Sequence, residues 1–250
     1  MDGRTTGAVL ILGGTPEAAA LARLASAEGL DAVTSLAGAT SRPMRPAGRV
    51  RIGGFGGADG LAAFLRAEGI GRVVDATHPF AARMHANAAA ACAAAGVPLL
   101  RLLRPPWAPE PGDRWLDARD AQEAASLLGP ALFHEAEGVV FLAVGRKDLA
   151  AFAGVDRPVL VRLIEPAPLP IGVATLILSR GPFRLEGELA LLRDKAVRVV
   201  VAKNSGGAGA YAKLAAARAL GLPVVMIARP PLPPAEETAS VDAAFAWLRK

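Results

Sequence analysis

Two glycine-rich turns, one in each half of the chain, are the segments of this sequence best suited to bind anions. The segment 13–15 follows the apolar run 8–12, and the segment 203–207 follows the apolar run 197–202. Each turn leads into an alanine-rich helical pattern, whose first backbone N–H groups are unpaired and lie at the positive end of the helix dipole. The second turn adds the cation Lys203. Two such turns predict two anionic ligands, which suggests a cofactor and a substrate.

The loop after the second expected strand indicates the type of nucleotide. Folds that bind NAD place an acidic residue about 20 residues after the glycine turn, where it binds the ribose 2′-hydroxyl. Here the segment 35–42 holds Ser35 and Arg42 and no acid. These side chains can bind a 2′-phosphate, which a carboxylate would repel, so the segment favours NADP(H) over NAD(H). The alternative is a tight turn that binds no nucleotide.

A glycine-rich loop follows the third expected strand. Four glycines surround Phe55 in the segment 53–57, so the backbone can come close to a flat ligand while the ring packs against it. The alternative is a plain loop with Phe55 in the core. The expected cofactor-binding residues are Gly13, Gly14, Thr15, Ser35, Ala37, Gly38, Arg42, Gly54, Phe55, Gly56, Ala76, Thr77, His78 and Pro79.

A polar turn, Asp75–Ala81, ends the expected strand 72–76. It places Thr77 and His78 at the carboxyl end of a central strand, where open α/β sheets bind ligands. His78 is the first candidate for catalysis, because it could orient a nicotinamide, donate to a carboxylate or pass a proton. A histidine that only caps the next helix is the alternative.

Other residues around this turn are expected to be structural. Asp75 is expected to fix the turn, and Pro79 suits the first position of the next helix. His85 lies seven residues after His78 on the same helix face, where we expect it to be structural or at the rim of the site. Cys92 stands among alanines and is expected to be a small buried residue.

Basic residues recur just after successive strand ends in the second half. Because the carboxyl ends of parallel strands share one edge of a sheet, these side chains should converge, and arginine suits carboxylates and phosphates. The alternative is that some of them only face solvent or pair with Asp148 and Glu165. Tyr211 is a second candidate for catalysis, as a proton donor. The expected substrate-binding residues are Arg104, Gly145, Arg146, Ser179, Arg180, Lys203, Asn204, Ser205, Gly206, Gly207 and Lys213.

Strand-like and helical patterns alternate along almost the whole chain, which predicts a parallel α/β structure. The expected strands are 8–12, 31–36, 48–52, 72–76, 97–103, 139–144, 158–163, 174–179, 197–202 and 223–228. The expected helices lie near 16–28, 58–68, 79–95, 119–128, 147–153, 184–194, 208–220 and 240–248. Prolines in the segment 104–112 can continue neither element.

This proline-rich segment is interpreted as the linker between two Rossmann-like parallel-sheet domains, 1–105 and 106–250. The first is expected to bind NADP(H) and the second a polyanion, with the active site in a cleft between the domains. A second proline cluster, 230–234, separates the last expected strand from a C-terminal helix.

Composition excludes several classes of protein. The net charge of +5 suits nucleic acid or a polyanionic small molecule. Only 5% of residues are aromatic and they do not alternate with basic residues, so no nucleic acid is expected. No long apolar run or secretory signal is visible, so no membrane partner is expected. One cysteine gives neither a disulfide nor a metal cluster, which favours the cytoplasm and no metal site.

Several of these segments resemble one known family. The segments 10–15, 53–57, 74–81, 104–107, 181–183 and 203–207 are similar to those of the precorrin-6A reductase family of cobalamin biosynthesis. The likeness runs from end to end of the chain. The blocks 75–81 and 203–207 are specific when found together in this order, whereas the glycine turns are generic. His85 departs from the family pattern, in which a small residue such as serine is expected.

The resemblance implies an NADPH-dependent oxidoreductase with a tetrapyrrole-derived polycarboxylate substrate. It would reduce one double bond of the precorrin-6A macrocycle to give precorrin-6B. Hand-over of the macrocycle to neighbouring corrin-pathway enzymes is a further expectation. Two alternatives stay open: a cobalt-precorrin-6A reductase of the anaerobic pathway, whose substrate carries cobalt, and a non-catalytic NADP-binding sensor.

Overall fold

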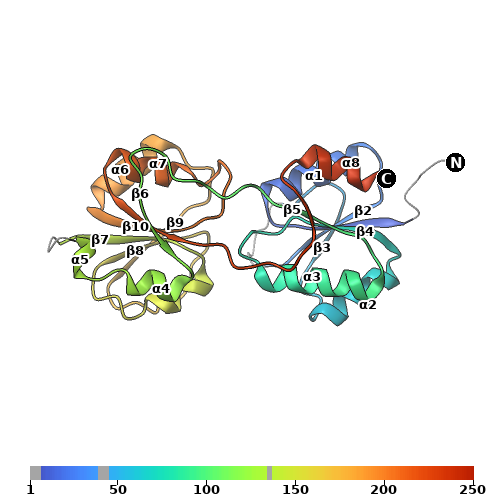
Figure 1. The fold of residues 1–250 in the computed structure, drawn as a ribbon, viewed down its shortest axis with the longest axis horizontal. Coiled ribbons are helices and arrows are strands. Elements are labelled where there is room, and N and C mark those ends of the chain that lie inside the picture. The colour runs from blue at the N-terminus through green and yellow to red at the C-terminus, as the bar shows by residue number, and fades with distance from the viewer. Residues whose placement is uncertain (1–6, 39–44, 134–136) are drawn as a thin grey trace. The chain divides into compact units, whose positions relative to one another are not determined.

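The chain folds as two compact units. A computed structural model describes residues 7–38, 45–133 and 137–250. The first unit comprises Met1–Pro105 and Pro231–Lys250, and the second comprises Pro106–Pro230. Each is built on a six-stranded sheet with helices on both faces (Figure 1), and every strand pairing in the described residues is parallel. The predicted α/β class with two parallel sheets is confirmed.

The sheet of the first unit has the order β12-β5-β4-β1-β2-β3. Its strands are β1 (Ala8–Leu12), β2 (Ala32–Leu36), β3 (Arg49–Ile52), β4 (Ile70–Asp75), β5 (Leu99–Leu102) and β12 (Glu236–Thr238). Helices α1 (Pro16–Ala27) and α8 (Val241–Leu248) cover one face, and α2 (Ala58–Ala67) and α3 (Ala82–Ala95) cover the other (Figure 1).

Strand β1 shows why this sheet needs helices on both faces. Val9 and Ile11 point into the core beneath α1 and α8, whereas Leu10 and Leu12 point into the core beneath α2 and α3. Alternate residues of a strand face opposite sides of the sheet, so a strand covered on both sides must be apolar throughout. The continuous apolar run 9–12 therefore marks a central strand.

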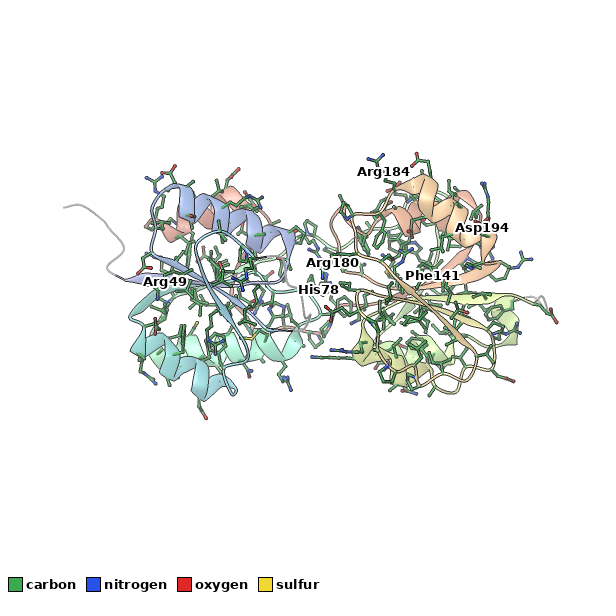
Figure 2. The ribbon with its side chains drawn as sticks, turned by 180° about the vertical axis from the view of Figure 1, so that it is seen from behind. Arg49, His78, Phe141, Arg180, Arg184 and Asp194 are labelled. Carbon is green, nitrogen blue, oxygen red and sulfur yellow. The ribbon has the colours of Figure 1, made fainter. Side chains whose placement is uncertain are left out.

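The sheet of the second unit has the order β6-β11-β10-β7-β8-β9. Its strands are β6 (Arg114–Ala118), β7 (Val139–Ala143), β8 (Val159–Leu163), β9 (Ala174–Leu178), β10 (Val197–Lys203) and β11 (Pro223–Ile227). Its helices are α4 (Ala121–Ser126), α5 (Pro130–Phe133), the 3-10 helix η1 (Arg146–Phe152), α6 (Leu185–Asp194) and α7 (Ala212–Ala219). Phe141 lies in the middle of this unit, in the core beneath α6 and α7 (Figure 2).

The C-terminal segment belongs to the first unit, so the prediction that 106–250 form one domain is wrong for residues 231–250. Strand β12 pairs with β5 in the first sheet, and Trp247 and Leu248 of α8 pack in its core. The second proline cluster thus separates the two units a second time. Strand β12 has three residues, two of them glutamates, and such a segment has no apolar pattern from which to predict a strand.

A buried arginine fixes this C-terminal segment to the sheet. The Arg101 side chain on β5 is fully buried, and its Nη1 lies 2.5 Å from Glu237 Oε1 of β12. Its Nη2 donates to the carbonyl oxygen of Pro233 over 2.8 Å. The long-range contacts of one side chain therefore determine the position of a strand that the local sequence does not predict.

Several element boundaries differ from expectation. Helix α3 begins at Ala82 with Ala81 as its N-cap, so the prediction that Pro79 opens this helix is wrong. A separate turn comes first, in which the Ala81 N–H donates to the His78 carbonyl over 2.7 Å. The expected helix 208–220 begins only at Ala212, and the expected helix 147–153 is the 3-10 helix η1. Strand β6 and helix α5 were also not predicted. No helix among the described residues is long and apolar enough to cross a membrane.

Candidate functional site

The first glycine turn joins β1 to α1 at the carboxyl edge of the first sheet. A Cβ on Gly13 would lie 3.1 Å from the Thr34 side chain, and Gly14 has a φ of +119°, which favours glycine. Thr15 is the N-cap of α1, where its hydroxyl accepts from the Ala18 N–H over 3.1 Å. The same hydroxyl donates to the Ala76 carbonyl over 2.7 Å. These contacts join the glycine turn to the end of β4.

An acidic residue, Glu17, lies in the first turn of α1, where it would repel an anionic ligand. Arg104 compensates its charge, with Nη1 2.9 Å from Glu17 Oε2. Both side chains are mostly buried. The structure thus places Arg104, an expected substrate-binding residue, in an ion pair beside the glycine turn.

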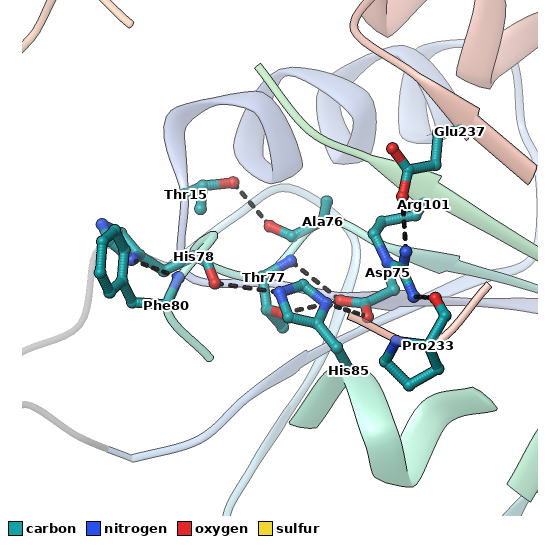
Figure 3. Close-up of polar contacts among 10 residues, drawn as sticks. All are labelled: Thr15, Asp75, Ala76, Thr77, His78, Phe80, His85, Arg101, Pro233 and Glu237. Carbon is teal, nitrogen blue, oxygen red and sulfur yellow. Dashed lines mark hydrogen bonds and ion pairs between the residues drawn. The ribbon is translucent and has the colours of Figure 1, made fainter. Parts of the chain in front are cut away.

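The turn after β4 is held by Asp75 and His85, both fully buried (Figure 3). Asp75 Oδ1 accepts from the Thr77 hydroxyl over 2.7 Å and from the Thr77 N–H over 3.2 Å. Its other oxygen lies 2.6 Å from His85 Nδ1, and His85 Nε2 lies 3.1 Å from the His78 carbonyl oxygen. The His85 ring thus bridges the Asp75 carboxyl group and the His78 carbonyl oxygen. Asp75 thus holds this turn, as expected, and His85 is buried within it rather than at the rim of the site.

His78 itself is exposed at this edge. Its Nδ1 accepts from the Phe80 N–H over 3.2 Å, and its ring lies 5.9 Å from that of Phe80. The His78 side chain therefore lies outside the core, whereas its backbone carbonyl is in contact with the buried His85. Thr77 and Pro79 on either side are buried.

Cys92 of α3 is buried beneath this turn, as predicted. Desolvation, together with the nearby Asp75, raises the pKa of its thiol to about 12. The thiolate is therefore not formed at neutral pH, and Cys92 acts as a small apolar residue of the core.

The glycine loop after β3 is organised by Arg51, a residue that the sequence analysis did not select. Its guanidinium donates to the carbonyls of Gly53 and Gly54 over 2.6 and 2.7 Å and lies 3.9 Å from the centre of the Phe55 ring. Phe55 itself is half-buried and packs on Phe64. On the neighbouring strand β2, Ser35 lies near the carboxyl end, and Ala37 and Gly38 come directly after the strand. Arg42 lies outside the described residues.

The second glycine turn, 203–207, makes extensive contacts within its own unit. Lys203 forms a close ion pair with Asp148, which is the alternative reading raised for it. The Asn204 side chain bonds to both backbone polar groups of Trp107. Its Oδ1 accepts from the Trp107 N–H over 2.7 Å, and its Nδ2 donates to the Trp107 carbonyl over 2.9 Å. The Gly207 carbonyl accepts from the Trp107 indole over 2.9 Å.

Arg229, which follows β11, supports the same turn. Its guanidinium donates to the carbonyls of Asn204 and Ser205 over 2.9 and 3.1 Å. Ser205 and Gly206 are buried. The turn is therefore a rigid element at the carboxyl edge of the second sheet.

Exposed cations occur at two loops of this edge, after β7 and after β9, with β8 between these strands. Gly145 and Arg146 follow β7 and are exposed, and Arg180 is exposed after β9. Ser179 beside it is half-buried, and its hydroxyl has no hydrogen-bond partner among the described residues. Among the expected substrate-binding cations, Arg146 and Arg180 are the ones that the structure leaves exposed.

Tyr211 belongs to a hydrogen-bonded cluster at the start of α7. Its hydroxyl donates to Glu110 and accepts from Arg218 Nη2 over 2.5 Å, and Arg218 also pairs with Asp113. Burial and the bond to Glu110 raise the pKa of the Tyr211 hydroxyl, against the opposing effect of Arg218. A hydroxyl with a raised pKa and two partners is a poor proton donor.

Lys213 is buried, so its role differs from that of the exposed cations. Its Nζ donates to the Ala210 carbonyl over 2.6 Å and lies 4.9 Å from the Trp107 ring. Desolvation lowers the pKa of this amine to about 8, although Glu188 opposes the shift. Glu188 pairs through both oxygens with Arg162, at 2.7 and 3.0 Å. Sequence reasoning missed this buried pair, because its members lie 26 residues apart.

Two parallel α/β units with glycine turns at their carboxyl edges define a protein of the Rossmann-like class. A model of the precorrin-6x reductase family, CbiJ/CobK, matches residues 8–249. The chain is 51% identical over 244 residues to the precorrin-6A reductase of Rhodococcus erythropolis, covering 96% of both chains. It is 32% identical over 264 residues to the cobalt-precorrin-6A reductase of Salmonella typhimurium, covering 97% of both.

A solved structure titled CobK precorrin-6A reductase superposes with a TM-score of 0.90 at 45% identity, covering 97% of this chain and 96% of that one. The chain belongs to the precorrin-6x reductase family. It is an oxidoreductase, as the resemblance of its motifs implies.

Proposed function

We propose that this chain reduces one double bond of precorrin-6A to give precorrin-6B in cobalamin biosynthesis, with NADPH as the reductant. The identity of 51% to a relative named precorrin-6A reductase, over nearly the whole of both chains, carries this proposal. The lower identity of 32% to a relative named cobalt-precorrin-6A reductase favours a metal-free substrate. A reaction that consumes NADPH fits the cytoplasm, which is the compartment we propose.

The first unit has features that suit a dinucleotide. The backbone at Gly14, Gly54 and Gly56 has open space where a side chain would begin, so a ligand can approach the peptide groups closely. Ser35 lies near the end of β2, where an NAD-binding fold carries an acid. We therefore assign the cofactor to the expected residues of this edge, from the 13–15 turn to the 76–79 turn. NADPH supplies the hydride when bound.

His78 is the residue of this unit that we assign to the reacting groups. Reduction of a carbon–carbon or carbon–nitrogen double bond requires a hydride at one atom and a proton at the other. An exposed imidazole above a rigid turn can position the reactants or deliver the proton. We assign this role to His78 rather than Tyr211, because the Tyr211 hydroxyl is engaged by Glu110 and Arg218.

The second unit is proposed to bind the carboxylates of the macrocycle. Arg146 and Arg180 are exposed at the carboxyl edge of its sheet, and arginine binds carboxylates through two parallel hydrogen bonds. The 203–207 turn supports this edge through its contacts with Asp148 and Trp107. Lys213 is too deeply buried to reach a ligand without rearrangement.

The proposal is tested by mixing the purified chain with precorrin-6A and either NADPH or NADH. We expect nicotinamide absorbance to fall only when macrocycle is present, and faster with NADPH. The product should gain the mass of two hydrogen atoms. Activity with cobalt-precorrin-6A alone would move the assignment to the cobalt-bearing substrate, and no oxidation of either cofactor would refute the proposed function.

A further inference from the structure

We propose that Arg51 recognises the adenosine 2′-phosphate of NADPH and makes the enzyme prefer NADPH to NADH. The inference rests on the proposed function, in which the first unit binds the dinucleotide. It assigns to a residue of β3 the role that the sequence analysis gave to Arg42, which lies outside the described residues.

The sheet register brings Arg51 to the end of β2. Ser35 and Arg51 are direct partners in the pairing of β2 with β3, and Arg51 Nη1 lies 3.4 Å from Ser35 Oγ. Ser35 stands where an acidic residue binds the ribose hydroxyls in NAD-dependent folds. The guanidinium therefore lies beside the position expected for the adenosine ribose, although it comes from a different strand.

The guanidinium is fixed before any ligand binds. Its Nη1 and Nη2 donate to the carbonyls of Gly53 and Gly54, and its Cζ lies over the Phe55 ring, 3.9 Å from the ring centre. An arginine has five N–H donors. The contacts to Gly53, Gly54 and Ser35 use one donor each, which leaves donors on Nε and Nη2 for a ligand. A phosphate that binds them meets a cation whose rotamer is already set, so little conformational entropy is lost.

The charge of Arg51 has no carboxylate partner among the described residues. The contrast with Arg49, two residues earlier on the same strand, is direct: Arg49 lies 2.9 Å from Asp31 and 3.3 Å from Glu68. Arg49 is at the amino end of β3, far from the edge that carries His78 (Figure 2). A fixed, uncompensated guanidinium at the ligand-binding edge is suited to a dianionic phosphate.

The test compares Arg51→Gln with Arg49→Gln as the matched control. Glutamine keeps an N–H donor for the Gly53 carbonyl but removes the charge. Dissociation constants are measured by calorimetry for NADPH, NADH and adenosine 2′,5′-bisphosphate. We expect Arg51→Gln to weaken NADPH and the bisphosphate roughly 10- to 100-fold, the range for a charge-assisted contact, while NADH changes less than about threefold. Arg49→Gln should leave all three constants unchanged.

Further outcomes separate this inference from the proposed function. Equal loss of NADPH and NADH in Arg51→Gln would show that Arg51 only supports the loop, and an unchanged preference would also overturn the inference. Arg51→Lys, which keeps the charge, should retain part of the preference if Arg51→Gln folds poorly. Loss of the preference in Arg42→Gln alone would return the role to Arg42. Failure of the unchanged enzyme to bind either dinucleotide would instead refute the proposed function.

Discussion

At the scale of single residues, the candidate site depends on a buried pair beneath an exposed side chain. Asp75 and His85 are both fully buried, and together they fix the backbone on which His78 stands. Removing one partner of a buried hydrogen-bonded pair leaves the other polar group desolvated and without a partner, which is costly. The two histidines should therefore respond differently to substitution.

Substitution of His85 should affect mainly stability. His85→Ala leaves one oxygen of the buried Asp75 carboxyl group without its hydrogen-bond partner, so we expect the free energy of unfolding to fall by about 1–3 kcal/mol. Urea denaturation of the variant and the unchanged enzyme measures this difference. A loss well below about 1 kcal/mol would show that Asp75 does not need His85 as a hydrogen-bond partner.

Substitution of His78 should affect mainly turnover. Its side chain is exposed, so His78→Ala should change the melting temperature little. Turnover should fall roughly 10- to 1,000-fold, as expected when a positioning or proton-transferring group is lost. Steady-state kinetics and thermal unfolding of the same variant give both values. Normal turnover with a lower melting temperature would show that His78 only supports the turn.

At the scale of elements, the loops at strand carboxyl ends carry the expected ligand contacts and the helices hold them in place. The N-cap of α1 is the same Thr15 hydroxyl that reaches the end of β4, so one residue both starts a helix and positions a neighbouring loop. In the second unit, the 203–207 turn is held by contacts to Asp148, Trp107 and Arg229. Rigid loops of this kind can present exposed cations such as Arg146 at fixed positions.

Substitution of Arg146 tests whether the second unit binds the substrate. Arg146→Ala should raise the KM for precorrin-6A roughly tenfold or more, because a charge-assisted contact is lost. The dissociation constant for NADPH should stay within about twofold. Arg193→Ala, an exposed arginine in the last turn of α6, is the control and should change neither value. A weakened NADPH complex in Arg146→Ala would place this residue with the cofactor.

Apolar runs and glycine turns predict the central strands, but not the elements that depend on distant partners. Strand β1 is covered on both faces and is apolar throughout, so local pattern identifies it. Strand β12 carries two glutamates and is held by Arg101 from far along the chain. The Asp75 turn could be predicted from its residues, whereas the approach of Arg51 to Ser35 depends on the sheet register and could not.

At the scale of the whole molecule, the chain returns to the first unit after it has passed through the second, and its C-terminal segment 231–250 completes the first unit. Trp247 and Leu248 of α8 share a core with β1 and α1. The second unit has its own core beneath α6 and α7. The two units should therefore differ in their response to changes in the last helix.

Truncation of a side chain in α8 tests this assignment. Leu248 is fully buried, so Leu248→Ala should lower the stability of the first unit by about 2–5 kcal/mol. Amide hydrogen exchange should speed up in β1 and β4 while β7 and β10 stay protected. Faster exchange confined to the second unit would mean that the C-terminal helix belongs there.

Transfer of deuterium from labelled cofactor tests the central proposal most directly. The enzyme is supplied with precorrin-6A and NADPH that carries deuterium at the transferable position of the nicotinamide, and the product is examined by mass spectrometry. We expect one deuterium in each product molecule and one cofactor oxidised for each macrocycle reduced. Equally labelled NADH should react more slowly. Reduced product without deuterium, or no reduced product, would contradict direct hydride transfer from NADPH to this substrate.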